Sequence, residues 1–209
     1  MPKTPAIRHI LFQTAIGTCG VAWSSHGLVS LALPERDAAA TEKRLIAKSA
    51  SASAAAAPPD IAQAIEQIRK YCAGERIDFS TVALDLSAID PFRQKIYQTM
   101  RALRFGETTT YGELAKQTGA SDWEAARDVG IAMGQNPLPI VVPCHRVLAA
   151  GGKLGGFSAY GGTATKEKLL ALEGVRLSPL RTALRPTSAR RSARSERRPG
   201  ERTPRLPGL

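Results

Sequence analysis

Apolar residues in the first ninety positions gather in short runs with turn residues between them. Three runs stand out, at residues 10–12, 19–23 and 28–33. Gly17 and Gly27 lie between them, where tight turns are expected. Short β-rich runs separated by glycine are typical of paired neighbouring strands. The pattern therefore predicts a meander of antiparallel strands.

The spacing of apolar residues then changes to the period of a helix. It predicts helices over residues 36–48 and 61–72, the second with Asp60 as its N-cap. Residues 49–59, rich in alanine and serine, are expected to form a loop or an interrupted helix end. A short strand at 82–86 is expected to return to the sheet. The first ninety residues thus predict a small antiparallel-sheet domain with helices, of the α+β class.

From Pro91 onward the pattern is mostly helical. Apolar residues recur at helical spacing in the first of these helices, at Phe92, Ile96, Met100 and Leu103. Two helices over about 111–116 and 123–133, joined by a glycine-containing turn, have the outline of a helix-turn-helix. Ser121 or Asp122 caps the second, and a last helix covers 166–172. The predicted parts are residues 1–90, 91–178 and 179–209.

The 209-residue chain carries a formal charge of +11, which is unevenly distributed. Residues 179–209 hold nine arginines, no lysine and two glutamates, so this tail carries +7 and the preceding residues +4. Its proline, serine and arginine content without apolar periodicity predicts a disordered basic tail. Such a tail binds nucleic acid through phosphates without sequence preference; a solvated extension with no partner is the alternative.

The apolar runs are too short to cross a membrane, and the first residues lack the apolar block of a secretory signal. The three cysteines, Cys19, Cys72 and Cys144, are odd in number and far apart. This usage argues against a disulfide framework and for a reducing compartment. We therefore expect a cytoplasmic protein with no membrane partner.

A cysteine-histidine pair, Cys144-His145, follows the apolar run at 138–142 and lies between Pro143 and Arg146. Only the thiolate form of cysteine is a strong nucleophile, and a basic neighbour lowers the thiol pKa from its usual value of about 8.5. A lone Cys-His dipeptide is a weak signal of catalysis. The motifs around it decide its interpretation.

Residues from about 92 to 175 resemble the catalytic DNA-binding domain of the O6-alkylguanine-DNA alkyltransferases, also called methylated-DNA–protein-cysteine methyltransferases. The matching motifs are Thr110-Tyr111-Gly112-Glu113-Leu114-Ala115, Ala125-Ala126-Arg127, Gly134-Gln135-Asn136-Pro137, Ile140-Val141-Val142-Pro143-Cys144-His145-Arg146-Val147, and Lys166-Glu167 with Leu169-Leu170-Ala171-Leu172-Glu173-Gly174. Ordered matches at the family's spacing are far more specific than any one of them. The resemblance implies a ribonuclease H-like N-terminal domain before a winged-helix-like helix-turn-helix domain.

The resemblance implies DNA repair by a suicide enzyme, a methylated-DNA–protein-cysteine S-methyltransferase. In this family a cysteine takes the alkyl group from O6 of guanine, and less readily from O4 of thymine, in double-stranded DNA. The thioether is not reversed, so each molecule acts once. Cys144 matches the nucleophile, and His145 matches the general base that acts through a water. Glu173 matches the carboxylate that orients the histidine, and Asn136 the amide that holds the active-site turn.

The resemblance also implies the contacts with DNA and with the base. Arg127 matches the arginine that fills the gap left by the flipped nucleotide, and Tyr111 the tyrosine that crowds the 3′ phosphate. Ala125 and Ala126 supply the small helix face that the minor groove requires. The expected pocket for the base and its alkyl group consists of Met133, Pro139, Val147, Ser158 and Tyr160. No cofactor is expected, because the damaged DNA is itself the donor, and we expect a monomer.

Three features depart from the family pattern. The segment between Tyr111 and Arg127 is about two residues longer than the commonest spacing. The second helix of the helix-turn-helix carries three acidic residues, Asp122, Glu124 and Asp128, which weaken attraction to phosphates. In the loop at 155–162, three residues remain alternatives for contacting the base: Phe157, Ser158 and Tyr160.

Some relatives hold a structural zinc in the N-terminal part, where this chain has His9, Cys19 and His26. Their spacing fits no standard zinc pattern, and a structural zinc normally has four ligands. We expect no metal.

Two other classes of function remain as alternatives to the enzyme. One is a binding module that flips and flags alkylated guanine without transfer, but relatives of that type lack the cysteine that Cys144 provides. The other is a transcriptional regulator that reads sequence with its helix-turn-helix. Salt-dependent binding without preference for a lesion would favour the regulator.

Overall fold

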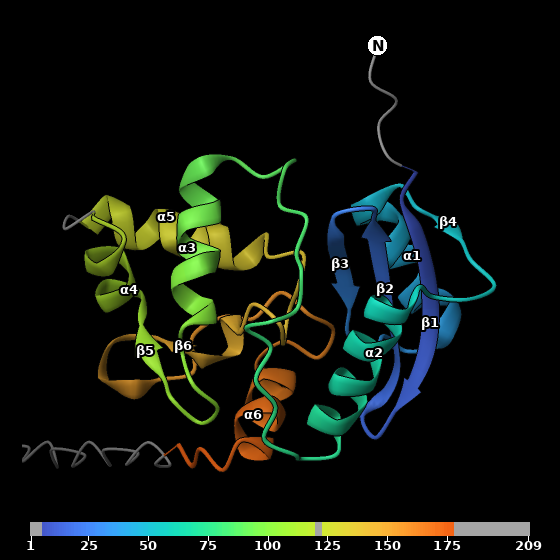
Figure 1. Cartoon of the computed structure of the whole chain (residues 1–209). Helices are drawn as coiled ribbons and strands as arrows, with labels where there is room; N and C mark the ends of the chain where they lie inside the picture. Colours follow the sequence, from blue (N-terminus) through green and yellow to red (C-terminus); the bar gives the residue numbers. More distant parts are fainter. Residues whose placement is uncertain (1–5, 120–122, 178–209) are drawn as a thin grey trace, which may run out of the picture. The chain divides into compact units, whose positions relative to one another are not determined.

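The computed structural model describes residues 6–119 and 123–177, with the backbone alone for 123–126. Four strands form its main sheet: β1 (Arg8–Thr14), β2 (Gly17–Ser24), β3 (Gly27–Ala32) and β4 (Ala52–Ser53). Their order is β3-β2-β1-β4, and β1, β2 and β3 pair antiparallel (Figure 1). The predicted meander is therefore present.

The strand β4 corrects the prediction of a loop or helix end at 49–59. It pairs parallel to β1, with Arg8 opposite Ala52. Backbone hydrogen bonds from Ala52 N to Ile7 O (3.0 Å) and from Ala54 N to His9 O (2.9 Å) hold it there. Alanine and serine have little intrinsic strand preference, so this edge strand depends on its distant partner.

The strand predicted at 82–86 is reduced to a single bridge between Leu28 and Leu84. Leu28 N donates to Ala83 O, and Asp85 N to Leu28 O, both at 2.9 Å. Gly27 makes this approach possible, because a Cβ there would lie 2.5 Å from the oxygen of Ala83.

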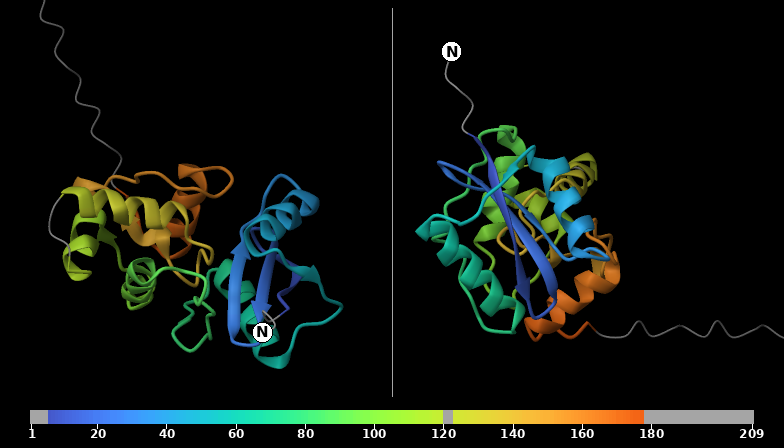
Figure 2. Two further views of the ribbon diagram at one scale, coloured as in Figure 1. Left: turned by 90° about the horizontal axis from the view of Figure 1, so that it is seen from above. Right: turned by 90° about the vertical axis from the view of Figure 1, so that its right-hand side faces the viewer.

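Two helices cover opposite faces of the sheet: α1 (Ala38–Ser49) and α2 (Pro59–Cys72). Successive residues of β2 alternate between them, since Val21 belongs to the core beneath α2 and Ala22 to a small cluster with Leu45 of α1. Figure 2 shows the helices on the two sides of the strands in its right-hand view. Gly20 leaves room for two leucine side chains, because a Cβ there would lie 2.7 Å from Leu11 of β1 and 2.9 Å from Leu45 of α1.

The predicted N-cap of α2 is wrong by two positions. Asp60 lies inside the first turn, and Pro58 occupies the cap position without a side-chain hydrogen bond. Pro59 therefore takes the first helical position, where its fixed φ suits the helix and its missing N–H costs nothing.

The second half contains four longer helices: α3 (Pro91–Arg101), α4 (Tyr111–Gln117), α5 (Trp123–Gly134) and α6 (Thr163–Leu172). Asp90 caps α3 by accepting from Arg93 N at 3.0 Å. A capping box formed by Thr110 and Glu113 begins α4. The residues predicted to cap α5, Ser121 and Asp122, lie outside the described residues.

A pair of short strands was not predicted. In it β5 (Thr109–Thr110) runs parallel to β6 (Val147–Leu148). It connects the start of α4 to two short 3₁₀ turns, η1 (Cys144–Arg146) and η2 (Ala150–Gly152). The whole arrangement confirms the predicted α+β class, with an N-terminal sheet and a mostly helical second part.

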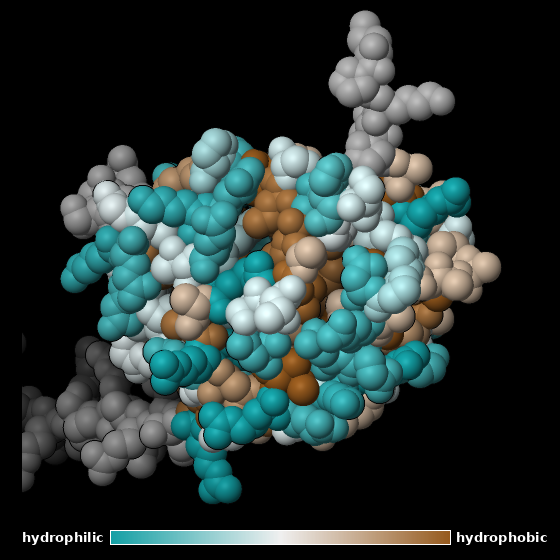
Figure 3. Space-filling view, viewed as in Figure 1, coloured by the Kyte–Doolittle hydropathy of each residue, from teal (hydrophilic) through white to brown (hydrophobic). Residues whose placement is uncertain are grey.

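One hydrophobic core continues from the sheet region into the helical region. Its buried members come from both halves and include Leu28, Ile68, Tyr71, Ile96, Met100, Val142 and Leu169. In the view of Figure 3, apolar surface gathers in a strip along the segment between α2 and α3. The division near residue 90 stays a prediction, and the tail at 179–209 lies outside the described residues. Of the helices that are described, none is long and apolar enough to cross a bilayer.

Candidate active site

The segment from Asn136 to Pro143 forms a buried turn that ends at Cys144. Asn136 holds both ends of it, because its Nδ2 donates to Val142 O at 2.8 Å and its Oδ1 accepts from Leu138 N at 3.0 Å. Asn136 is the only asparagine in the chain. Ile140, inside the turn, has φ 73°, a region that β-branched residues rarely adopt. A buried side chain amide and a buried isoleucine thus keep a strained backbone in place.

The N-terminal half supports this turn from outside. In β3, Leu31 N donates to Pro137 O at 2.8 Å and Ser30 Oγ to the same oxygen at 3.2 Å. From α1, Lys48 Nζ donates to Asn136 O at 3.3 Å. The active-site turn therefore lies along the β3 edge of the sheet.

His145 and Glu173 lie in contact, and Cys144 directly precedes the histidine in the chain. All three residues are at most 6% exposed. His145 Nε2 lies 2.7 Å from Glu173 Oε1, although 28 positions separate them. An ionised carboxylate only accepts hydrogen bonds, so Nε2 carries the proton and Nδ1 presents a lone pair. Among the described residues, Nδ1 is buried and has no hydrogen-bond partner.

Glu173 lies at the C-cap of α6 and accepts hydrogen bonds from several elements. Arg146 Nε (2.9 Å) and Gly106 N (2.9 Å) donate to Oε2, and Arg146 Nη2 (2.9 Å) donates to Oε1. Tyr71 of α2 donates its hydroxyl proton to Oε1 at 2.7 Å. Burial raises the pKa of Glu173, but the hydrogen bonds from His145 and Arg146 outweigh it and hold that pKa well below its usual range.

The thiol and the imidazole are both neutral at rest. Burial raises the pKa of Cys144, while a hydrogen bond from Asn136 and the charge of Lys166 oppose the rise. Burial also lowers the pKa of His145, against the attraction of Glu173. Desolvation outweighs the influences that lower the pKa of Cys144, so the thiol form is favoured. For Cys144 to act as a nucleophile, a base must therefore remove the thiol proton.

A cavity of about 460 Å³ opens beside Cys144. Its walls are Tyr111, Gly130, Met133, Gly134, Cys144, Gly156, Phe157 and Ser158. Two predicted pocket residues, Met133 and Ser158, thus line it with the thiol. Pro139 lines a smaller cavity of about 20 Å³ that also borders Cys144.

The other two predicted pocket residues lie elsewhere. Tyr160 is 54% exposed and lines neither cavity. Val147 is buried, and its carbonyl accepts from Lys166 Nζ at 2.6 Å. Of the three loop alternatives, Phe157 and Ser158 line the larger cavity. Their roles, and those of Tyr160 and Val147, stay predictions.

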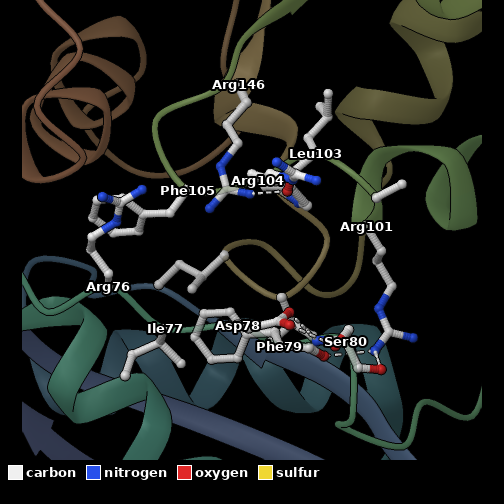
Figure 4. Close-up of a pocket in the computed structure, with 14 residues that line it drawn as sticks. Arg76, Ile77, Asp78, Phe79, Ser80, Arg101, Leu103, Arg104, Phe105 and Arg146 are labelled. Carbon is white, nitrogen blue, oxygen red and sulfur yellow. Dashed lines mark hydrogen bonds between the residues drawn. The ribbon is translucent and has the colours of Figure 1, made fainter.

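A second cavity of about 460 Å³ lies behind the active-site turn, against Pro143. Four arginines line it: Arg76, Arg101, Arg104 and Arg146 (Figure 4). Arg101 donates to three backbone carbonyl groups of residues 79–82 at 2.7 to 3.0 Å, and Arg76 lies over the ring of Phe105. These contacts tie the segment between α2 and α3 to the helical half, and none of the predicted catalytic residues lines this cavity.

The residues predicted to contact DNA lie on α4 and α5. Tyr111 begins α4 at the mouth of the cavity, and Arg127 is exposed on α5. Ala125 and Ala126 lie on the same helix, but their side chains fall outside the described residues.

The three residues considered for zinc do not converge. His9 is buried between Ser51 Oγ (3.0 Å) and Glu42 Oε1 (3.1 Å), where it joins α1 and the residue before β4 to β1. Cys19 is buried in the core, and the His26 side chain is exposed. No group of three histidine, cysteine or acidic side chains suited to a metal occurs in the part of the chain that the structure describes.

Sequence reasoning missed three polar groups of this site. In the sequence Arg146 is only one residue of the motif at 140–147, and no neighbouring residue marks it as the counterion of Glu173. Lys166 is fully buried, and burial lowers its pKa to about 8 against the opposing influence of Cys144. Tyr71 lay in a helix that looked purely structural. An apolar helix face that contains a tyrosine was the one available signal, because a buried hydroxyl normally finds a partner.

The fold and the site define a class: an α+β protein with a small N-terminal sheet, a mostly helical second part and a buried cysteine beside a histidine-carboxylate pair. Two family sequence models match the chain. The 6-O-methylguanine DNA methyltransferase ribonuclease-like domain matches residues 7–86, and the DNA binding domain of the same family matches residues 91–175. The chain belongs to the 6-O-methylguanine DNA methyltransferase family, which confirms the resemblance seen in its motifs.

Individual relatives agree. A Mycolicibacterium paratuberculosis protein named methylated-DNA–protein-cysteine methyltransferase is 47% identical over 116 residues, which is 56% of this chain and 67% of the relative. The crystal structure of Mycobacterium tuberculosis O6-methylguanine methyltransferase has a TM-score of 0.64 at 34% identity, over 83% of this chain and 96% of that one. A structure of Mycobacterium tuberculosis OGT in complex with DNA has a TM-score of 0.63 at 34% identity. The match covers 79% of this chain and 92% of that one.

Proposed function

We propose that this chain repairs DNA by a single, irreversible transfer of an alkyl group from O6 of guanine to Cys144. The observation that carries the proposal is the Cys144 side chain in the wall of a cavity of about 460 Å³, beside His145, whose buried Nδ1 has no hydrogen-bond partner among the described residues. Membership of the 6-O-methylguanine DNA methyltransferase family supports the same chemistry. We expect O4-alkylthymine to react less readily.

The reaction proceeds by in-line displacement. Cys144 Sγ forms a bond to the alkyl carbon as the bond from that carbon to O6 breaks. The thiol proton passes through a water to His145 Nδ1. The departing guanine anion takes up a proton from solvent water, and the imidazolium later returns its proton to solvent. Glu173 stabilises the imidazolium through Nε2–H, as the carboxylate of a catalytic triad does. The thioether has no ready leaving group, so the protein acts once.

DNA is the proposed partner, bound as a duplex by one copy of the chain. The helix pair α4 and α5 carries the contacts, with Ala125 and Ala126 against the minor groove. Arg127 takes the place of the flipped guanine, and Tyr111 rotates the nucleotide outward by crowding its phosphate. The three free cysteines fit the cytoplasmic location expected from the sequence.

Mass spectrometry of the protein and its peptides, after incubation with duplex DNA containing one O6-methylguanine, tests this function. We expect one added methyl group, on the peptide that contains Cys144, and restored guanine in the DNA. The peptides of Cys19 and Cys72 serve as internal controls, because both thiols are at most 1% exposed in the core.

The Cys144→Ala variant is expected to retain binding to the lesion and to lose transfer completely. A methyl group on another residue would move the nucleophile away from Cys144. Lesion binding with no methyl group on the wild-type chain would contradict transfer and favour a flagging role.

A further inference from the structure

Tyr71 connects the N-terminal half of the chain to the catalytic pair. It lies on α2, within the residues that match the ribonuclease-like domain, whereas His145 and Glu173 lie within the DNA-binding domain. We propose that Tyr71 is a positioning residue, supplied by the N-terminal domain, that holds His145 and Glu173 in the arrangement needed for proton transfer. The proposal deepens the proposed function and rests on it.

The Tyr71 hydroxyl contacts both members of the pair. It donates to Glu173 Oε1 at 2.7 Å, and its oxygen lies 3.1 Å from His145 Nε2. The side chain is fully buried, and the rings of Phe79 and Phe105 pack edge-on against it. Because the ring cannot move without disturbing this packing, the hydroxyl is fixed in position.

The single proton of the hydroxyl determines what this contact does. Since the proton points to Glu173, a lone pair of the tyrosine oxygen faces the Nε2–H of His145. The imidazole N–H then has acceptors on two sides, which fixes the ring plane and keeps the lone pair on Nδ1. Burial and the charge of Glu173 raise the pKa of Tyr71, so the hydroxyl keeps its proton.

The hydroxyl also limits how strongly Glu173 attracts a proton onto His145. By donating to Oε1 it withdraws negative charge from the oxygen that faces the imidazole. This contact, at 2.7 Å, is shorter than the 3.1 Å contact to Nε2, so its effect on the carboxylate dominates. Loss of the hydroxyl is therefore expected to raise the pKa of His145.

Tyr97 is a second buried tyrosine, and among the described residues its hydroxyl makes no hydrogen bond with His145 or Glu173. It is also fully buried, but its hydroxyl donates to the backbone carbonyl of Ala132 at 2.9 Å. Tyr97→Phe is therefore a matched control for Tyr71→Phe, because each variant removes one buried, hydrogen-bonded hydroxyl from a tyrosine.

The test measures single-turnover transfer from free O6-benzylguanine base across pH, so that DNA binding plays no part. For Tyr71→Phe we expect the rate at pH 7 to fall about tenfold, to recover partly at higher pH, and the midpoint of the profile to rise. Tyr97→Phe is expected to keep the wild-type midpoint. An unchanged or lowered midpoint in Tyr71→Phe, or a rate loss explained by unfolded protein alone, would overturn the proposal.

Nitrogen NMR of the His145 ring separates this proposal from the proposed function. In the wild-type protein we expect the proton of the neutral ring on Nε2. In Tyr71→Phe we expect the pKa of the His145 ring to be higher than in the wild type. A proton on Nδ1 in the wild type would overturn the positioning role even if the variant does not fold. Absence of benzyl transfer to wild-type Cys144 would instead overturn the proposed function, while the ring measurement still decides the role of Tyr71.

Discussion

Cys144 is buried as a thiol. In the proposed reaction its reactivity depends on His145 and Glu173, which act when the thiol proton is removed. Desolvation keeps both the thiol and His145 neutral, and Glu173 keeps its charge because Arg146 and His145 donate to it. A neutral thiol is a much weaker nucleophile than a thiolate. In the proposed reaction the thiolate forms only as His145 accepts the proton.

The ionised Glu173 also contributes to stability in a pH-dependent way. Its pKa is lower in the folded chain than in the unfolded chain, where it is about 4.3. The contribution is therefore fully present above the unfolded value and is lost as the pH falls toward the folded value. We expect Glu173→Gln to lower the free energy of unfolding at pH 7 by about 3–5 kcal/mol, because Arg146 loses its buried counterion.

Urea unfolding between pH 3 and pH 7 measures this effect. The difference between wild type and Glu173→Gln should shrink below about pH 4, where protonation removes the wild-type advantage. Glu66→Gln is the control, because Glu66 forms an exposed pair with Arg69 and should change stability little at any pH. A constant difference across the whole range would contradict the assigned ionisation of Glu173.

At the scale of elements, the site is assembled from ends and turns. The proposed nucleophile Cys144 lies in η1, the Glu173 carboxylate at the C-cap of α6, and the Asn136 amide just after α5. Helices and strands provide rigid supports, while their ends leave side chains and backbone groups available for chemistry. The strand pair β5 and β6 provides a further support, because it joins the start of α4 to the residues that follow η1.

The exposed Arg127 on α5 gives a prediction about that helix. Arg127→Ala should slow repair of O6-methylguanine in duplex DNA by about tenfold or more, because nothing then fills the gap left by the flipped base. Reaction with the free O6-benzylguanine base should change little. Parallel single-turnover measurements with the two substrates check this expectation.

The control for that comparison is Lys70→Ala, which removes one exposed positive charge from α2, away from the proposed DNA contacts. It should leave the ratio of the two rates as in the wild type. Equal losses with both substrates in Arg127→Ala would remove its role in base flipping.

At the scale of the whole molecule, the two halves share one hydrophobic core and one active site. The sheet edge supports the active-site turn through Pro137, and α2 supplies Tyr71. The N-terminal half therefore contributes contacts to the site. Substitutions in its core are expected to alter the positions of His145 and Glu173.

The basic tail gives a prediction that involves the complete chain. Deleting residues 179–209 should weaken binding to undamaged duplex and reduce the slope of log K against log salt, by up to about 0.9 for each arginine that meets a phosphate. Transfer from free O6-benzylguanine should be unchanged. A full-length chain with its nine tail arginines replaced by glutamine controls for length, and an unchanged salt slope would exclude tail contact with DNA.

The sequence alone determined the features that depend on local periodicity and on motif order. The meander from β1 to β3 and the existence of α2, α3 and α6 could all be predicted, although α6 begins at Thr163, three residues before its predicted start. These features follow from side-chain spacing along one stretch of chain. Even Glu173 was assigned correctly to the neighbourhood of His145, although through resemblance to a family.

Tertiary structure decided the contacts between segments that lie far apart in the chain. Three such contacts have no local pattern in the sequence. They are the pairing of β4 with β1, the salt bridge of Arg146 with Glu173, and the hydrogen bond of Tyr71 to the same carboxylate, 102 positions away. Each contact consists of hydrogen bonds that form only when packing brings the donor and acceptor together and removes water from them. Desolvation likewise set the neutral state of Cys144, because the burial of a thiol is a property of the folded chain.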